Sequence, residues 1–250
     1  MRILYAGDSS VGGAANYLLG VLRWLSARVQ HVSPSSTLTP NLLRHRYDAV
    51  ILSDFPSRHA PDRSQALIAQ HVQQGTGLLM VGGWASFSGP SGGWRGSRIE
   101  QLLPVRCLAR DDRVQWAGGA LIVPERRHSM FRSLSFDDPP VICGFNAVRP
   151  TPASHVLLRA HRLVTRNGHP ASVTLASSGE PILVIHADPS LRTAALTTDL
   201  APHWCGGLVD WGRARIRLPV YNHHRIEVGD RYVRWVTALI RWLARADQAQ

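Results

Sequence analysis

Apolar runs of strand length alternate with helical patterns in the first part of the chain. Residues 3–6, 47–54 and 77–83 are apolar runs with the length of buried strands. Residues 14–29 and 61–74 instead repeat apolar side chains at the spacing of an amphipathic helix, and a glycine follows the second segment. The pattern predicts three strands separated by two helices.

Continuous apolar strands joined by helices are typical of a parallel sheet that is covered on both faces. Right-handed crossovers then place helices on both sides of that sheet. We therefore predict an α/β fold with a flavodoxin-like, doubly wound, mostly parallel sheet.

The middle of the chain, residues 106–177, has a different pattern. Its short alternating runs are interrupted by proline and glycine, which predicts antiparallel strands added to the sheet. Strands at 181–186 and 193–197 and an amphipathic helix at 232–246 follow. We expect residues 1–250 to form one domain, with 106–177 as a strand-rich insertion within it.

Composition fits an ordinary folded protein, since 44% of the residues are hydrophobic and 18% are charged. The N-terminus has no secretory pattern, and no apolar stretch reaches the roughly 20 residues of a membrane helix. We expect a cytoplasmic protein without a membrane partner.

The three cysteines are far apart, and we expect Cys107 and Cys143 to be small core residues.

The net charge of +11 raises the question of nucleic-acid binding. All 28 basic residues are arginine, which resembles a coding bias, and they are scattered along the chain. No helix-turn-helix, zinc finger or aromatic RNA-binding motif accompanies them. We do not expect nucleic acid to be a partner.

Ligands of open α/β sheets bind outside the carboxyl ends of the strands. The segments that follow the predicted strands are rich in acids, serines and tryptophans, which suit stacking on a sugar ring or a protein interface. The same tryptophans could instead fix loops onto the sheet. The predicted cleft for a small-molecule or carbohydrate ligand consists of Asp8, Ser9, Asp54, Gly83, Trp84, Ser86, Asp199, His203 and Trp204.

Some of these segments resemble a known family. The most specific block is residues 77–87, followed by a glycine-rich loop and 99–105; the second is 198–204, and 47–54 agrees as well. Together they resemble the glutamine amidotransferase-like family, a group of bacterial proteins with a class I amidotransferase-type fold. The resemblance runs from about residue 2 to residue 245.

This resemblance implies a specific difference in chemistry. A class I amidotransferase places a nucleophilic cysteine of a Cys-His-Glu triad on a tight turn after a strand. The equivalent turn here, residues 81–84, contains neither cysteine nor serine. We therefore expect no glutaminase activity and predict a pseudoenzyme, which acts as a non-catalytic binding or assembly module. A homo-oligomer is compatible with the assembly role.

A hydrolase is the alternative, with Ser9 or Ser86 as nucleophile and His203 and Asp199 as base and orienting acid. Residues 7–10 resemble the start of a GDSL-type esterase, but three residues rather than two separate Asp199 from His203.

No cofactor or metal ion is expected. The chain has no P-loop and no lysine to reach a phosphate. His223 and His224 are adjacent and would diverge, and His203 with Cys205 lacks further ligands nearby.

Overall fold

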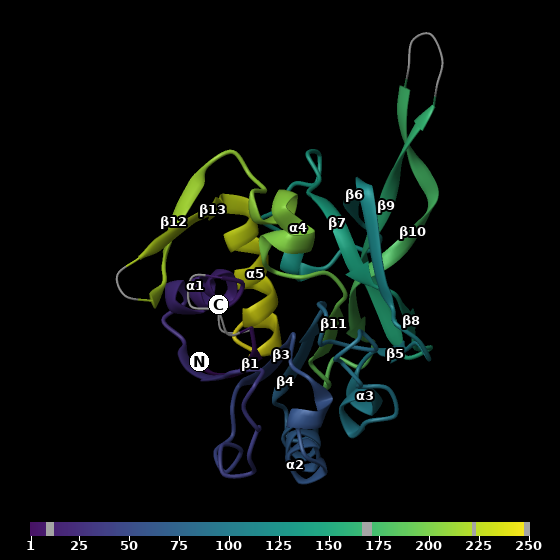
Figure 1. Cartoon of the computed structure of the whole chain (residues 1–250). Helices are drawn as coiled ribbons and strands as arrows, with labels where there is room; N and C mark the ends of the chain where they lie inside the picture. Colours follow the sequence, from purple (N-terminus) through teal and green to yellow (C-terminus); the bar gives the residue numbers. More distant parts are fainter. Residues whose placement is uncertain (9–12, 167–171, 222–223, 248–250) are drawn as a thin grey trace.

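The structure is a computed structural model that describes residues 1–8, 13–166, 172–221 and 224–247. A nine-stranded sheet has the order β2-β1-β3-β4-β11-β10-β9-β6-β7 (Figure 1). Its first five strands are mutually parallel. These are β1 Arg2–Gly7, β2 Arg28–Val32, β3 Ala49–Ser53, β4 Gly77–Val81 and β11 Thr193–Leu196. This order is the flavodoxin-like one, so the predicted fold class is confirmed.

The remaining four strands extend the same sheet in antiparallel fashion. They are β6 Arg113–Pro124, β7 Val141–Asn146, β9 Ser154–Arg166 and β10 Ser172–His186. The prediction of antiparallel strands in this region is confirmed. The expected strand at 181–186 is the second half of β10 rather than a separate element. The long β9–β10 hairpin projects from the body of the molecule (Figure 1).

Two small antiparallel ribbons flank the main sheet. The first pairs β5 Val105–Cys107 with β8 Val148–Pro150, and the second pairs β12 Arg215–Pro219 with β13 Arg225–Gly229. The helices are α1 Ala15–Trp24, α2 Asp62–Gln73, α3 Arg98–Leu102, α4 Pro202–Val209 and α5 Asp230–Leu243, with short 3₁₀ turns at Ser57–His59 and Ser129–Phe131.

Two hydrophobic clusters lie on opposite faces of the sheet. Ile3 and Tyr5 of β1 join the cluster of α1, α4 and α5, whereas Leu4 and Ala6 join the cluster of α2 and α3. This alternation follows from the period of a strand, whose successive side chains point to opposite faces. No helix in the described ranges is long and apolar enough to cross a membrane.

Three details differ from the sequence-based expectations. The helix expected at 14–29 ends at Trp24, because Ser26 adopts a positive φ of 52° that breaks the helix before β2. Trp24, whose position in the predicted helix indicates a core or helix-packing residue, is 53% exposed. Cys107 is buried as predicted, but Cys143 is exposed, because it points to the face of β7 opposite its buried neighbour Ile142.

Candidate functional site

The parallel strands bring three carboxyl groups to one edge of the sheet. Asp8 follows β1 and Asp54 follows β3, and the last residues of these strands, Gly7 and Ser53, are register partners. Asp199 lies just beyond the end of β11. Since β1, β3, β4 and β11 are consecutive parallel strands, these three carboxyl groups lie along the same edge of the sheet. We call Asp8, Asp54, Gly83, Trp84, Asp199 and His203 the strand-end site.

Asp8 is half-buried and held by two hydroxyl groups. Tyr5 Oη and Ser53 Oγ donate to its Oδ2 at 2.9 and 2.7 Å. Burial raises the pKa of Asp8, while these two donors and the nearby His203 lower it. Its φ of 26° places Asp8 in a region that few non-glycine residues adopt, and Asp is one of the residues that tolerate it.

Asp54 has the same unusual backbone, with a φ of 50°. Its Oδ1 accepts a hydrogen bond from the N–H of Ala85 at 2.6 Å, and its own N–H donates to Ser86 Oγ at 3.1 Å. The pKa of Asp54 is raised to about 6, because burial and then the negative charge of Asp8 outweigh the lowering effects of the backbone N–H groups and His203. This carboxyl group therefore titrates close to neutral pH.

Asp199 is the most buried of the three acids. Its Oδ1 accepts hydrogen bonds from the N–H groups of Leu200 and Ala201 at 2.6 and 3.0 Å. Burial first, and then the charges of Asp8 and Asp54, raise the pKa of Asp199 well above its usual value. Ionisation of Asp199 is therefore less favourable than that of an exposed aspartate, while its Oδ1 stays engaged by two backbone N–H groups.

His203 lies in the first turn of α4 and is exposed. Its influence on the pKa values of both Asp8 and Asp54 places it near these two carboxyl groups. The site thus combines three carboxyl groups with raised pKa values and an imidazole. Such a set can bind hydroxyl or amine groups, and groups that titrate near neutral pH are also the usual acids and bases of catalysis.

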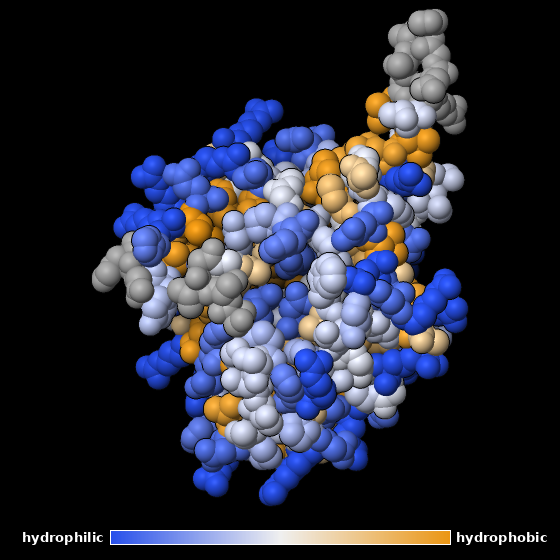
Figure 2. All heavy atoms as spheres, viewed as in Figure 1, coloured by the Kyte–Doolittle hydropathy of each residue, from blue (hydrophilic) through white to orange (hydrophobic). Residues whose placement is uncertain are grey.

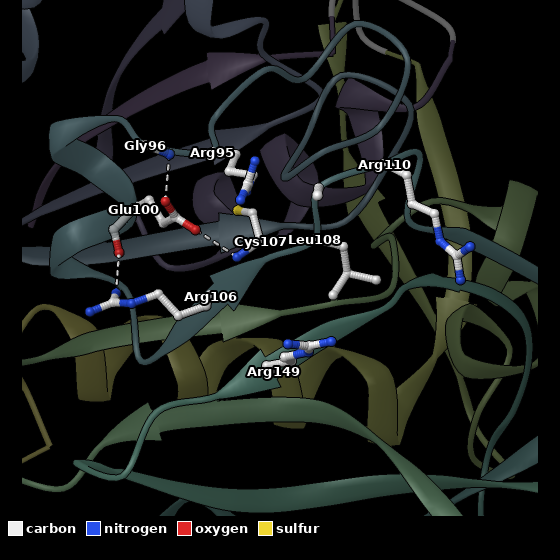
Figure 3. Close-up of a pocket in the computed structure, with 9 residues that line it drawn as sticks. Arg95, Gly96, Glu100, Arg106, Cys107, Leu108, Arg110 and Arg149 are labelled. Atoms are coloured by element: carbon white, nitrogen blue, oxygen red, sulfur yellow. Dashed lines mark hydrogen bonds between the residues drawn. The ribbon is translucent and has the colours of Figure 1, made fainter.

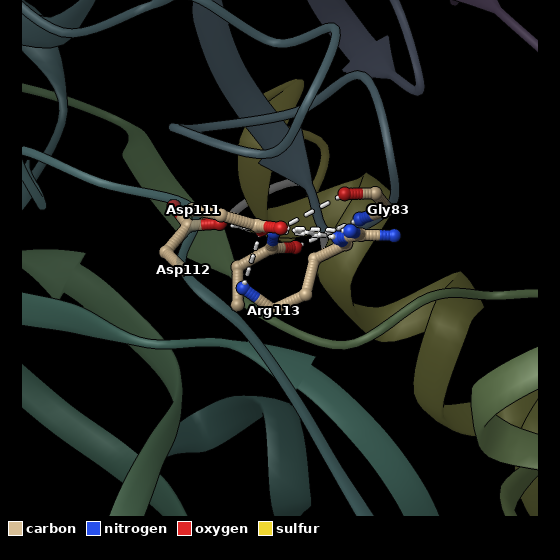
Figure 4. Close-up of polar contacts among 5 residues, drawn as sticks. Gly83, Asp111, Asp112 and Arg113 are labelled. Carbon is tan, nitrogen blue, oxygen red and sulfur yellow. Dashed lines mark hydrogen bonds and ion pairs between the residues drawn. The ribbon is translucent and has the colours of Figure 1, made fainter.

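The turn after β4 is fixed by side chains that the sequence did not single out. Asn146 Oδ1 accepts from the N–H of Gly83 at 2.8 Å, and its Nδ2 donates to the Gly83 carbonyl at 3.1 Å and to Asp112 Oδ1 at 2.7 Å. Figure 4 shows this network. Asn146 ends β7 and Asp112 precedes β6, so their partnership with Gly83 depends on the tertiary fold and leaves no local sequence signal.

This turn has no room for a side chain at its two glycines. A Cβ on Gly82 would lie 2.0 Å from the carbonyl oxygen of Thr197, and a Cβ on Gly83 would lie 2.2 Å from Asp54 Oδ1. Real Cβ atoms essentially never come so close to another atom. A cysteine at either glycine would therefore displace the neighbouring strand end or Asp54.

Trp84 follows these glycines and is 56% exposed. The guanidinium of Arg113 stacks on its ring at 4.0 Å from the centroid. Asp111 holds that guanidinium through hydrogen bonds from Nε and Nη2, as Figure 4 shows. One face of the indole is therefore supported from within the protein.

Not all of the other residues predicted to line the ligand cleft are exposed. Trp204 is only 4% exposed and packs against Gly144 of β7, where a Cβ would lie 2.5 Å from the indole ring. It is a packing residue and not part of the rim. Ser86 is also buried, with its hydroxyl accepting the Asp54 N–H. Ser9 lies outside the described residues, as does His223.

Two of the three thiols are buried. Cys205 is fully buried, and its Sγ donates to the Ala201 carbonyl at 3.0 Å. Burial raises the pKa values of the Cys205 and Cys107 thiols, which disfavours the reactive thiolate. Cys143 is exposed on β7.

A metal ion would need several suitable ligands in one place. Within the described ranges no group of three or more His, Cys, Asp or Glu side chains has an arrangement that could hold one. The strand-end acids are engaged by hydroxyl and backbone donors instead.

Comparison with known proteins agrees with this fold. Two cytoplasmic proteins from Salmonella typhimurium superpose with a TM-score of 0.62, at 22% and 26% identity, each over 82% of this chain and 90% of its own length. PurLQS from Thermotoga maritima superposes with a TM-score of 0.50 at 11% identity, over 97% of this chain and 98% of its own. A search of the curated proteins finds no match.

The family described as "Putative glutamine amidotransferase" matches residues 14–221. That match spans most of the chain and includes Asp54, Gly83, Trp84, Asp199 and His203. The protein therefore belongs to the glutamine amidotransferase-like family.

Proposed function

We propose that this protein is a non-catalytic binding module whose ligand is a small polar molecule, such as a carbohydrate, bound at the strand-end site. The supporting observation is the convergence of three carboxyl groups with raised pKa values near the exposed imidazole of His203. A carboxylate accepts hydrogen bonds from sugar hydroxyls, and a carboxyl group that is protonated also donates one.

Trp84 supports the same proposal. A sugar ring binds through an apolar face on an aromatic ring as well as through its hydroxyl groups. Arg113 and Asp111 restrict the motion of the indole, so less conformational entropy is lost when a ligand stacks on it. The exposed part of Trp84 remains free for such contact.

The absence of glutaminase activity is part of this proposal. Thioester chemistry needs an accessible thiolate at the turn after β4, and that turn carries Gly82, Gly83 and Trp84. The tight packing at both glycines and the buried, hydrogen-bonded thiol of Cys205 support a pseudoenzyme.

The hydrolase alternative has less support. Ser86 is buried and its hydroxyl is engaged by Asp54, and no hydrogen bond between Ser86 and His203 occurs among the described residues. Asp199 uses one oxygen to accept two backbone N–H groups, and burial raises its pKa, which disfavours the ionised form that would orient an imidazolium.

The proposal is tested by a thermal-shift screen of sugars, amino acids and nucleotides. A ligand that binds the native state at about 100 times its Kd adds roughly 2.7 kcal/mol of stability. We expect the shift to be lost in Trp84→Ala and kept in Trp24→Ala, which removes an equally exposed indole from α1. A shift that survives Trp84→Ala unchanged would place the ligand elsewhere.

A second assay addresses the chemistry directly. We expect the purified protein to release no ammonia from L-glutamine. Ammonia release that disappears in a Cys143→Ser or Cys205→Ser variant would refute the pseudoenzyme part of the proposal, whatever the outcome of the ligand screen.

An assembly role, as a homo-oligomer, is supported by a different observation. Val164, Val173 and Leu175 of the projecting β9–β10 hairpin are exposed hydrophobic residues. Figure 2 shows hydrophobic surface along this hairpin. Val173 and Leu175 share one face of the hairpin, because their register partners are Thr165 and Leu163, whereas Val164 pairs with Thr174 on the other face. Exposed apolar groups that share a face can mark an interaction surface. Light scattering after size exclusion should show an oligomer that Val173→Asp weakens; a wild-type monomer at high concentration argues against this role.

We also propose a cytoplasmic location in a bacterium. Its support is the name of the two Salmonella typhimurium proteins that share the fold.

A further inference from the structure

A second candidate site lies away from the strand ends. A cavity of about 700 Å³ opens between α3 and the β5–β8 ribbon, and none of its lining residues belongs to the strand-end site. Four arginines line it, together with a single acid, Glu100 (Figure 3). The arginines are Arg95, Arg106, Arg110 and Arg149.

The one carboxylate in the cavity is already engaged. Glu100 is buried, and its Oε1 and Oε2 accept hydrogen bonds from the N–H groups of Cys107 and Gly96 at 2.7 and 2.6 Å. Arg106 donates to the main-chain carbonyl of Glu100 at 3.2 Å rather than to its carboxylate. Glu100 therefore stabilises the wall of the cavity, and it forms no ion pair with an arginine among the described residues.

The four guanidinium groups also lack other acidic partners. None of the ion pairs found within the described ranges includes any of them. The nearby acids Asp111 and Asp112 are engaged with Arg113 and Asn146. All four arginines are exposed, so their donors are available to a ligand.

The ribbon itself holds two of these charges together. Arg106 and Arg149 are register partners of the antiparallel β5–β8 pair, and both are exposed while Val105, Cys107 and Val148 are buried. Like charges placed directly opposite each other on one face of a sheet are destabilising. An anion bound between them would turn this repulsion into two favourable contacts.

We propose that this cavity binds a small anion that carries linked phosphate groups, recognised through its phosphates. The volume lies in the range of small-molecule sites, and several arginines at one site are the typical recognition of phosphate oxygens. No aromatic side chain lines the cavity, so nothing there would stack on a base. This favours the phosphates of a small molecule over single-stranded nucleic acid.

The experiment is calorimetric titration of the full chain with inorganic tripolyphosphate at physiological salt. We expect saturable one-to-one binding. The double variant Arg106→Gln/Arg149→Gln should weaken it by about tenfold or more, because each lost charge-assisted hydrogen bond contributes strongly to affinity. The same variant should be at least as heat-stable as the wild type, since it removes the like-charge pair.

A matched control separates a site from general attraction to a basic protein. Arg28→Gln/Arg58→Gln removes the same charge from two exposed arginines outside the cavity and should bind tripolyphosphate like the wild type. Equal weakening in both double variants, or no saturable binding by the wild type, would overturn the proposal. Tighter binding of an RNA oligonucleotide than of tripolyphosphate at the same arginines would also overturn it. Trp84→Ala should leave this binding unchanged, which separates it from the proposed function.

Discussion

Asp54 shows how burial gives one residue an unusual titration. The folded chain raises its pKa from 3.8 to about 6, so the ionised form is less favourable in the folded state than in the unfolded state. This penalty is absent well below pH 3.8, grows as the pH rises between the two pKa values, and is complete above about pH 6. The native protein therefore retains a carboxylate that costs stability at neutral pH.

Asp54→Asn should consequently stabilise the protein at neutral pH. The amide oxygen can still accept the Ala85 N–H, while the ionisation penalty disappears. We expect a gain on the order of 1–3 kcal/mol at about pH 7.5 that shrinks at about pH 4, measured by urea unfolding. Asp137→Asn, at an exposed acid, should change little at either pH. A loss of stability at pH 7.5 would show that the ionised carboxylate is favourable.

At the scale of elements, the end of β7 supports the turn after β4. Asn146 is fully buried and joins Gly83 and Asp112, and its N–H donates to the Thr197 carbonyl at 2.8 Å. The antiparallel half of the sheet thus fixes the loop that carries Trp84.

Asn146→Ala should therefore destabilise the fold and loosen the site together. It leaves the buried N–H of Gly83 and a carboxylate oxygen of Asp112 without their partner, at a cost of about 2–4 kcal/mol. Thermal unfolding measures the loss, and the difference in tryptophan fluorescence between the protein and its Trp84→Phe variant, each with and without Asn146→Ala, reports the loop. Asn41→Ala, at an exposed asparagine, is the control. A shift no larger than that of Asn41→Ala would mean that the network contributes little.

The sequence predicted the parallel strands well because β3 and β4 are buried on both faces and read as continuous apolar runs. Edge strand β2 alternates exposed and partly buried residues, and the helix predicted at 14–29 overlaps its start. The boundary between helix and strand depends on the positive φ of Ser26, which the hydrophobic pattern does not indicate.

Part of the candidate site could also be predicted from the sequence. Asp8, Asp54 and Asp199 follow strands, so their convergence follows from the parallel topology. Trp84 and Trp204 look alike in the sequence, yet one is exposed and the other buried, because Gly144 on a distant strand provides the space that receives Trp204. Such long-range packing has no local pattern.

At the scale of the whole molecule, positively charged residues greatly outnumber negatively charged ones. The net charge is +11, and many of the ion pairs in the described ranges are exposed, where a pair contributes little. Self-repulsion of this size destabilises a compact state. The four arginines of the β5–β8 cavity concentrate part of that repulsion in one place.

Salt should therefore stabilise this protein. Raising NaCl from about 0.01 M to about 1 M shortens the Debye length from ~30 to ~3 Å, which screens repulsion over the whole surface. We expect about 1 kcal/mol of added stability, equivalent to a rise in Tm of roughly 2–4 °C, measured by calorimetry. Arg106→Gln/Arg149→Gln should show a smaller rise, because part of the repulsion is already gone. A Tm that falls with salt would mean that the ion pairs outweigh the excess positive charge.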